Sequence, residues 1–172
     1  MRLSLVTGGA GFVGRHLTGL LRAPGAPARV FDLACAETPD DIEGSVTDPD
    51  AAARAVEGAD TVFHLAGNAQ LWARDGRAFD RVNRGGAAVM LNAAKSAGVR
   101  RFVHCSSLTT LVGRATPIGP SHADELRRLG PEAMLGPYPR SKLEAETAGE
   151  RAAPRGADAG VALSPQTPGA GR

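Results

Sequence analysis

The sequence predicts an α/β fold with a doubly wound, mostly parallel sheet of about six strands. Short apolar runs alternate with helix-like stretches along most of the 172 residues. The first run, residues 3–7, leads into a glycine-rich turn, a helix-like stretch and a second strand within about thirty residues, which is a β-α-β unit. Because strands that alternate with helices form parallel sheets covered on both faces, this order indicates the fold class.

Each expected strand is a short run rich in apolar or β-branched residues, bounded by glycine, proline or charged residues. We expect strands at residues 3–7, 29–32, 41–46, 61–66, 101–106 and 160–163.

The expected helices lie between these strands, at residues 12–22, 48–57, 77–97 and 138 to about 153. Asp48 and Pro49 provide an N-cap and a first-turn proline, and Gly98 ends the third helix. Gly149 and Pro154 predict that the last helix is short or frayed. The Gly/Pro-rich stretch 113–136 is expected to hold at most one short helix, near residues 122–129.

Charge and composition exclude several classes of protein. The net charge is +2 and the basic residues are scattered, so nothing indicates a nucleic-acid or membrane partner. The two cysteines, Cys35 and Cys105, lie far apart, and the histidines lack metal-ligand spacing, so we expect no metal site. The first apolar run is too short for a signal peptide or a membrane span. We therefore expect a cytoplasmic protein.

Three glycines, Gly8, Gly11 and Gly14, are spaced GxxGxxG between the first strand and the first helix. Glycines there permit a tight turn, close approach of the backbone to a pyrophosphate and close packing of the helix on the sheet. Asp32 ends the second strand, where a carboxylate can accept hydrogen bonds from an adenosine ribose diol. No arginine follows Asp32 directly, so the pattern favours NAD over NADP as the cofactor of a Rossmann-like domain.

Three polar residues indicate acid–base chemistry. Tyr138 and Lys142 are four residues apart at the start of a predicted helix, so both can project from one face. A lysine ammonium near a phenol favours the phenolate form, which suits proton transfer. Ser107 follows the fifth strand at the sheet edge where doubly wound folds bind ligands, and its hydroxyl can polarise a substrate oxygen.

The whole set resembles the extended short-chain dehydrogenase/reductases, the NAD-dependent epimerase/dehydratase family. Residues 7–14 (TGGAGFVG) resemble the family's cofactor fingerprint, residues 64–67 (HLAG) its fourth-strand motif and Tyr138-Pro-Arg-Ser-Lys142 its YxxxK motif. Residues 71–75 (LWARD) resemble more narrowly the hopanoid-associated sugar epimerases and their dihydroflavonol-reductase-like relatives. The resemblance runs from residue 2 to about 169.

This resemblance implies roles for individual residues. Tyr138 would be the catalytic acid/base, Lys142 would hold the nicotinamide ribose, and Ser107 would orient the substrate oxygen, with Ser106 as the alternative. The residues implied to bind the cofactor are Gly8, Gly11, Phe12, Val13, Gly14, Asp32, Leu65, Ala66, Gly67, Asn83, Tyr138, Lys142 and Pro165.

The length of the chain leaves several functions open. Residues 1–164 are expected to form the NAD-binding domain and residues 165–172 an irregular tail, without the carboxy-terminal lobe that builds the substrate pocket in the family. One function is an oxidoreductase or epimerase acting on a hydroxyl or keto carbon of a small substrate. The alternatives are a non-catalytic NAD-binding module and an inactive truncated remnant. The expected partners are a small-molecule substrate and, through the helices after the fourth and fifth strands, a second copy of the chain.

Overall fold

A computed structural model describes residues 2–34, 38–70, 73–119, 129–152 and 159–164, with side chains described up to residue 152. The strands are β1 (Leu3–Thr7), β2 (Ala28–Asp32), β3 (Ile42–Glu43), β4 (Ala59–His64), β5 (Arg101–Ser107) and β6 (Ala159–Ser164). The helices are α1 (Phe12–Arg22), α2 (Pro49–Val56), α3 (Arg77–Phe79), α4 (Gly86–Ser96) and α5 (Pro137–Ala152). A π-helical turn, η1 (Asp80–Gly85), joins α3 to α4, and the 3₁₀ turns are η2 (Leu108–Leu111) and η3 (Pro131–Ala133).

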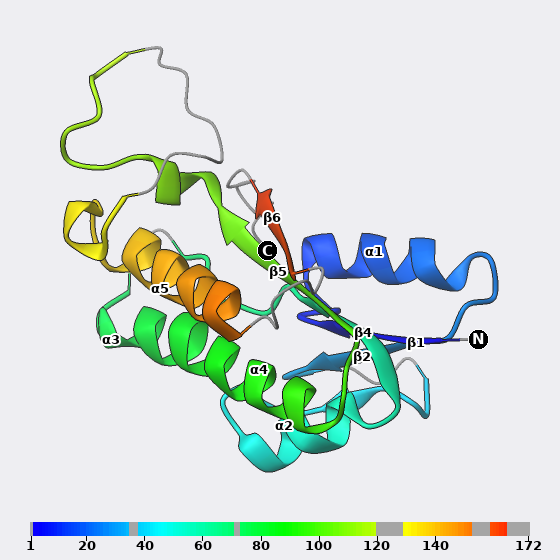
Figure 1. Cartoon of the computed structure of the whole chain (residues 1–172). Helices are drawn as coiled ribbons and strands as arrows, with labels where there is room; N and C mark the ends of the chain where they lie inside the picture. The colour runs from blue at the N-terminus through cyan, green and yellow to red at the C-terminus, as the bar shows by residue number, and fades with distance from the viewer. Residues whose placement is uncertain (1, 35–37, 71–72, 120–128, 153–158, 165–172) are drawn as a thin grey trace.

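The six strands form one parallel sheet in the order β3-β2-β1-β4-β5-β6. Figure 1 shows α1 on one side of this sheet and α2, α4 and α5 on the other. The predicted doubly wound fold is confirmed. The chain reverses its direction of winding at β1 and β4, so the loops after these strands meet at one edge of the sheet.

The hydrophobic core lies between the sheet and the helices α2 and α4. Leu5, Phe31 and Val62 point from β1, β2 and β4 towards Val56 and Met90 of these helices, and all five are at most 1% exposed. Burying each side chain contributes roughly 1.5–3 kcal/mol. This packing holds the strand ends, and therefore the loops that follow them, in fixed positions.

The start of α2 follows the sequence prediction. The Asp48 carboxylate accepts hydrogen bonds from the backbone N–H groups of Asp50 and Ala51, and Pro49 occupies the first turn. The predicted cap is confirmed.

The stretch predicted as one helix over 77–97 contains the π-helical turn η1 between α3 and α4. Gly85 and Gly86 lie where η1 meets α4. A Cβ on Gly86 would lie only 2.8 Å from Cγ2 of Val46, so the helix lies close to the segment that follows β3. π turns inside helices are frequent at functional sites, and this one carries Asn83.

Two other predictions of secondary structure were wrong in detail. Helix α5 runs for 16 residues through Gly149, because a single glycine costs a helix only about 1 kcal/mol. The strand expected at 41–46 pairs only at Ile42 and Glu43. In the described part of the chain, no helix combines the length and apolar character needed to cross a membrane. Cys35, residues 71–72, most of the helix expected at 122–129, Pro165 and the tail lie outside the described residues.

Candidate functional site

The glycine-rich loop between β1 and α1 is closely packed against the loop that follows β4. Gly8 has φ +70°, and a Cβ on it would lie 2.7 Å from the backbone nitrogen of Ala66. A Cβ on Gly14 would lie 2.1 Å from the oxygen of Gly8. Gly11 donates its N–H to the same oxygen at 3.0 Å and is the N-cap of α1, with no side-chain hydrogen bond at the cap. The first amides of α1 are therefore available to an anion.

Gly9 was not among the residues selected from the sequence, although the structure requires it. A Cβ on Gly9 would lie 2.6 Å from Cγ1 of Val30 in β2. The GxxGxxG pattern assigns roles only to the glycines at positions 8, 11 and 14. Position 9 needs a glycine because the Val30 side chain of β2 occupies the space that a Cβ would fill.

Asp32 lies at the end of β2, directly beside the loop. One carboxylate oxygen accepts the N–H of Ala10 at 2.9 Å, and the other accepts the N–H of Leu33 at 2.7 Å. A carboxylate offers about four acceptor positions, so these bonds are compatible with a further donor. Asp32 ends the second strand, as predicted, and its role towards a ribose stays a prediction.

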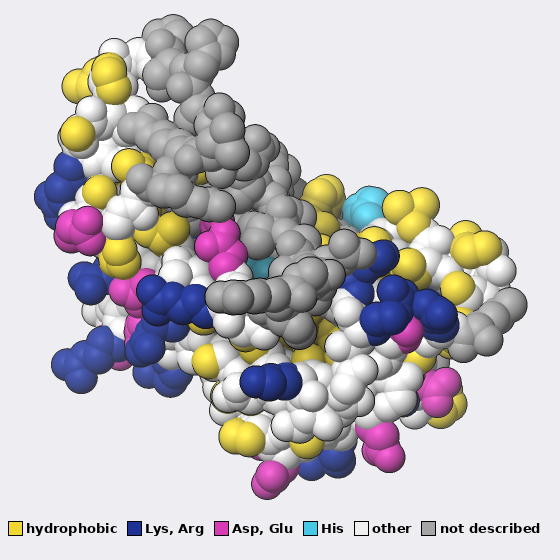
Figure 2. Space-filling model, in the orientation of Figure 1, with side chains coloured by type: hydrophobic (Ala, Val, Ile, Leu, Met, Phe, Trp, Pro, Cys, Tyr) yellow, Lys and Arg dark blue, Asp and Glu magenta, His cyan; other side chains and the backbone are white. Residues whose placement is uncertain are grey.

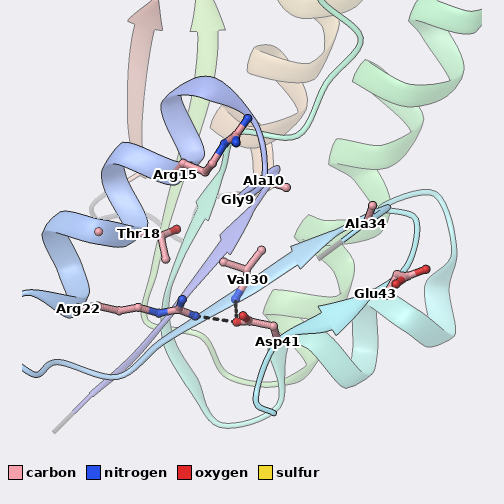
Figure 3. Close-up of a pocket in the computed structure, with 10 residues that line it drawn as sticks. Gly9, Ala10, Arg15, Thr18, Arg22, Val30, Ala34, Asp41 and Glu43 are labelled. Carbon is pink, nitrogen blue, oxygen red and sulfur yellow. Dashed lines mark hydrogen bonds and ion pairs between the residues drawn. The ribbon is translucent and has the colours of Figure 1, made fainter. Parts of the chain in front are cut away.

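A groove of about 670 Å³ runs along α1 beside the loop (Figure 3). Arg22 and the buried carboxylate of Asp41, which lie 2.7 Å apart, border it. Its lining includes Gly9 and Ala10 but none of the residues of the β4 loop or of α5. The groove therefore neighbours the phosphate loop without reaching the predicted acid–base residues. The residues that line it are Gly9, Ala10, Arg15, Thr18, Gly19, Arg22, Val30, Ala34, Asp41 and Glu43.

The loop after β4 contains three residues predicted to touch the cofactor. The N–H of Leu65 donates to the oxygen of Thr7, and the N–H of Ala66 donates to the Thr7 hydroxyl at 3.1 Å. A Cβ on Gly67 would lie 3.2 Å from Nζ of Lys142. The loop thus connects the phosphate loop with α5.

Lys142 and Tyr138 are both buried on α5, at 5% and 9% exposure. The ammonium of Lys142 donates to the oxygen of Cys105 at 2.9 Å. Burial lowers the pKa of Lys142, which the nearby Cys105 opposes in part. The Tyr138 ring makes an edge-on contact with Phe79, with ring centres 5.9 Å apart.

The prolines on either side of Tyr138 do not break the helix. Neither Pro137 nor Pro139 loses a helical hydrogen bond, because the first turn of a helix has no intrahelical acceptors for its N–H groups. The first bond is made by Arg140, whose N–H donates to the oxygen of Gly136 at 3.4 Å. The four-residue spacing of the tyrosine and the lysine is therefore helical, as predicted.

The Asn83 side chain in η1 joins the β4 loop to α5. Its Oδ1 accepts the N–H of Asn68 at 2.7 Å, and its Nδ2 donates to the oxygen of Asn68 and to the hydroxyl of Ser141. Asn83 is 2% exposed. Its predicted supporting role fits this geometry, whereas Ser141 was not singled out from the sequence.

The two serines at the end of β5 have different surroundings. The Ser106 hydroxyl donates to the Glu146 carboxylate on α5 at 2.7 Å, and both residues are buried. The Ser107 hydroxyl accepts from the N–H and the hydroxyl of Thr109. Ser106 is thus held by α5, whereas Ser107 ends β5 and its hydroxyl caps η2. Glu146 is a further residue that the sequence prediction did not include.

Two buried histidines lie beneath Lys142. The rings of His64 and His104 stack with centres 5.5 Å apart, and Nδ1 of His64 lies 2.8 Å from the Thr7 hydroxyl. Burial, aided by the Lys142 charge, lowers the pKa of His104 to about 3, and burial also lowers the pKa of His64. Both are therefore packed, neutral side chains.

Comparison with known proteins agrees with this geometry. A model of the NAD-dependent epimerase/dehydratase family matches residues 4–167. A 3β-hydroxysteroid dehydrogenase/Δ5→4-isomerase of Mycobacterium tuberculosis is 40% identical over 120 residues, which cover 63% of this chain and 32% of that protein. A putative dihydroflavonol 4-reductase of Synechocystis is 32% identical over 171 residues, which cover 95% of this chain and 48% of that protein.

Solved structures show the same likeness. A short-chain dehydrogenase/reductase superfamily protein from Agrobacterium tumefaciens with bound NAD is 31% identical, with a TM-score of 0.78. The match covers 94% of this chain and 48% of that one. The chain thus spans about half the length of this neighbour and half or less of the two relatives above.

Proposed function

Since the chain belongs to the NAD-dependent epimerase/dehydratase family, we propose that it binds NAD and serves an oxidoreductase or epimerase acting on a hydroxyl or keto carbon. The observation that carries this proposal is the convergence of three segments at one sheet edge. Gly8 packs on Ala66, and Gly67 packs beside the ammonium of Lys142. These contacts leave the phosphate loop, the β4 loop and α5 with small or polar groups where a dinucleotide would lie.

The residues of the chain fit this cofactor. The amides at Phe12 and Val13 would bind the pyrophosphate beside Gly11, whose own N–H donates to Gly8, and Gly8 and Gly14 provide the backbone space that a Cβ would fill. Asp32 would accept hydrogen bonds from the adenosine ribose, which favours NAD over NADP. Leu65, Ala66 and Gly67 would line the other half of the cofactor, and Lys142 would hold its second ribose.

The acid–base step belongs to α5. NAD, when bound, supplies hydride acceptance at its nicotinamide ring. Tyr138 would take the proton from the substrate hydroxyl, or return it to the carbonyl, at its phenol oxygen. The Lys142 ammonium would stabilise the phenolate, and the Ser107 hydroxyl would orient the substrate oxygen. Asn83 would support the lysine side of the site through the β4 loop.

Two measurements test the proposal in sequence. A thermal-shift titration with NAD should raise the unfolding temperature, because a ligand that binds only the folded state stabilises it. Absence of a shift at millimolar NAD would reject the cofactor site. NAD reduction should then be assayed with hydroxysteroids, nucleotide sugars and flavonols. Turnover that disappears in Tyr138→Phe supports the acid–base role, while NAD binding without any turnover supports the non-catalytic module.

The substrate is a separate proposal, and the relatives suggest where to begin. The relatives include hydroxysteroid dehydrogenases and a putative dihydroflavonol 4-reductase, and the solved neighbours include UDP-glucose 4-epimerases. These names describe dehydrogenases, a reductase and epimerases. We propose the same reaction class here, in the cytoplasm, with the free thiol of Cys105 fitting a reducing compartment.

We also propose that a second copy of the chain docks on α4 and α5. A groove of about 800 Å³ lies between η1–α4 and α5, and Figure 2 shows basic and acidic side chains gathered there, at the left of the view. Arg84 bridges Asp80 in η1 and Glu144 in α5, and Arg140 also pairs with Glu144. If the second copy exchanges these pairs for ion pairs across the interface, the dimer should weaken with salt. Sedimentation at low and high salt tests this, and a monomer at both salts would reject it.

A further inference from the structure

The Ser141 hydroxyl lies between Asn83 and the backbone of Tyr138. Nδ2 of Asn83 donates to the Ser141 oxygen at 2.9 Å, and the Ser141 hydroxyl donates to the oxygen of Tyr138 at 2.8 Å. All three residues are at most 9% exposed. In this dry setting each hydrogen bond is directional, and losing one leaves a buried polar group without its partner.

The first turn of α5 needs such a contact. Tyr138 precedes Pro139, and a residue before proline is disfavoured in helical geometry. The backbone bond that opens the helix, from Arg140 to Gly136, is long at 3.4 Å. Pro137 and Pro139 have no N–H and donate no backbone hydrogen bond. The turn that carries the phenol therefore opens with a long backbone bond, at a residue whose helical geometry the following proline disfavours.

The other end of this connection is firmly anchored. The Asn83 amide forms a two-way pair with the backbone of Asn68, accepting its N–H at 2.7 Å and donating to its oxygen at 3.1 Å. This pair sets the direction of the remaining N–H of the amide, which points at Ser141. Asn68 follows Gly67, so the connection begins at the loop that lies beside Lys142.

We infer that Ser141 is a positioning residue that sets the orientation of Tyr138 through Asn83, from the loop proposed to bind the cofactor. The inference deepens the proposed function and rests on Tyr138 being its acid/base. Ser141 does not touch the reacting atoms. It fixes the Tyr138 carbonyl, and thereby the turn from which the phenol projects.

The chain offers a direct test because Tyr138 is its only tyrosine. Protein labelled with ¹³C only at the tyrosine Cζ gives one labelled-carbon NMR resonance, so no assignment is needed. Ser141→Ala should shift and broaden this resonance, because the turn then samples several orientations. Thr147→Val is the matched control: its hydroxyl donates to the oxygen of Leu143 at 2.9 Å on the same helix, away from the site.

An isosteric pair separates the hydroxyl from packing. Ser141→Thr keeps the hydroxyl, and Ser141→Val has the shape of the threonine variant without its hydroxyl. The inference predicts a wild-type-like tyrosine resonance for the Thr variant and an altered one for the Val variant, even where Ser141→Ala fails to fold. A resonance unchanged in Ser141→Ala or Ser141→Val, or changed equally in Thr147→Val, overturns it.

The test is independent of the cofactor titration. An altered tyrosine resonance without any NAD thermal shift would reject the proposed function and leave the positioning contact standing. A normal NAD shift with an unchanged resonance in Ser141→Val would reject the positioning role alone.

Discussion

The ammonium nitrogen of Lys142 lies 2.9 Å from the backbone oxygen of Cys105, and this contact joins α5 to the end of β5. One turn further along α5, Glu146 accepts a hydrogen bond from Ser106. The helix is therefore attached at two successive residues of the strand, directly before Ser107. These attachments bring the predicted serine, tyrosine and lysine to one edge of the sheet.

Replacing Lys142 by methionine should stabilise the protein while weakening NAD binding. Burial lowers the pKa of Lys142 in the folded protein below its ordinary 10.5. At neutral pH the lysine charge therefore costs less free energy in the unfolded chain than in the folded one. Removing the buried charge should add about 1 kcal/mol, which is ~2–4 °C in a chain of this size. The gain should shrink as pH rises towards 10.5, where the wild-type lysine loses its proton.

Thermal unfolding at neutral and alkaline pH checks this prediction. The control is Lys95→Met, because Lys95 is the other lysine and is exposed on α4. Equal effects of the two substitutions would contradict the prediction.

Two glycines of α1 should respond in opposite directions to alanine. A Cβ on Gly14 would meet the Gly8 oxygen, whereas a Cβ on Gly19 meets nothing within 4 Å. Gly14→Ala should cost ~1–3 kcal/mol in unfolding free energy and abolish the NAD thermal shift. Gly19→Ala should raise stability by up to ~1 kcal/mol and keep the shift. Denaturant unfolding with and without NAD measures both, and a Gly14→Ala protein that still binds NAD would contradict the loop assignment.

The buried histidines should make the protein sensitive to acid. The pKa of His104 is about 3 in the fold against 6.5 ordinarily, and that of His64 is also lowered. Below pH 6.5 these two histidines bind protons in the unfolded chain but not in the folded one. The free energy of unfolding should therefore fall as the pH drops from about 6.5 towards 3. The slope should be ~1.4 kcal/mol per pH unit for each histidine.

His104→Phe should reduce this slope, because both ring nitrogens of His104 are buried without a hydrogen-bond partner. The comparison is His16→Gln on the exposed face of α1. Urea unfolding between pH 7 and 4 measures the slopes. Identical slopes for wild type and His104→Phe would show that other groups control the acid response.

Asp32→Asn should weaken NAD binding about tenfold or more, since hydrogen bonds to a charged group contribute ~1.5–3 kcal/mol. The substitution should narrow the preference for NAD over NADP, because a neutral amide no longer repels a 2′-phosphate. Calorimetric titration with both cofactors gives the two affinities. Asp40→Asn, an exposed acid before β3, should leave them unchanged. If Asp32→Asn kept the full preference for NAD over NADP, another residue would be responsible for that preference.

Sequence reasoning found the parts of the site that local patterns encode. Strand, glycine turn, helix and acid follow one another within residues 3–32, where apolar runs, glycine spacing and strand ends can be read directly. The same reasoning placed Tyr138 and Lys142 on one helix. It did not find the π turn around Asn83, because the sequence there is compatible with an ordinary helix.

By itself the sequence determined the order of the elements, the phosphate loop and the residue types at the strand ends, since these depend on neighbours along the chain. Only the tertiary structure decided which partners hold those residues. Asn83 meets Ser141 across 58 positions and Ser106 meets Glu146 across 40. Such contacts form when sheet and helices pack together, because close packing and the need to satisfy buried polar groups select the partners, and no local pattern records them.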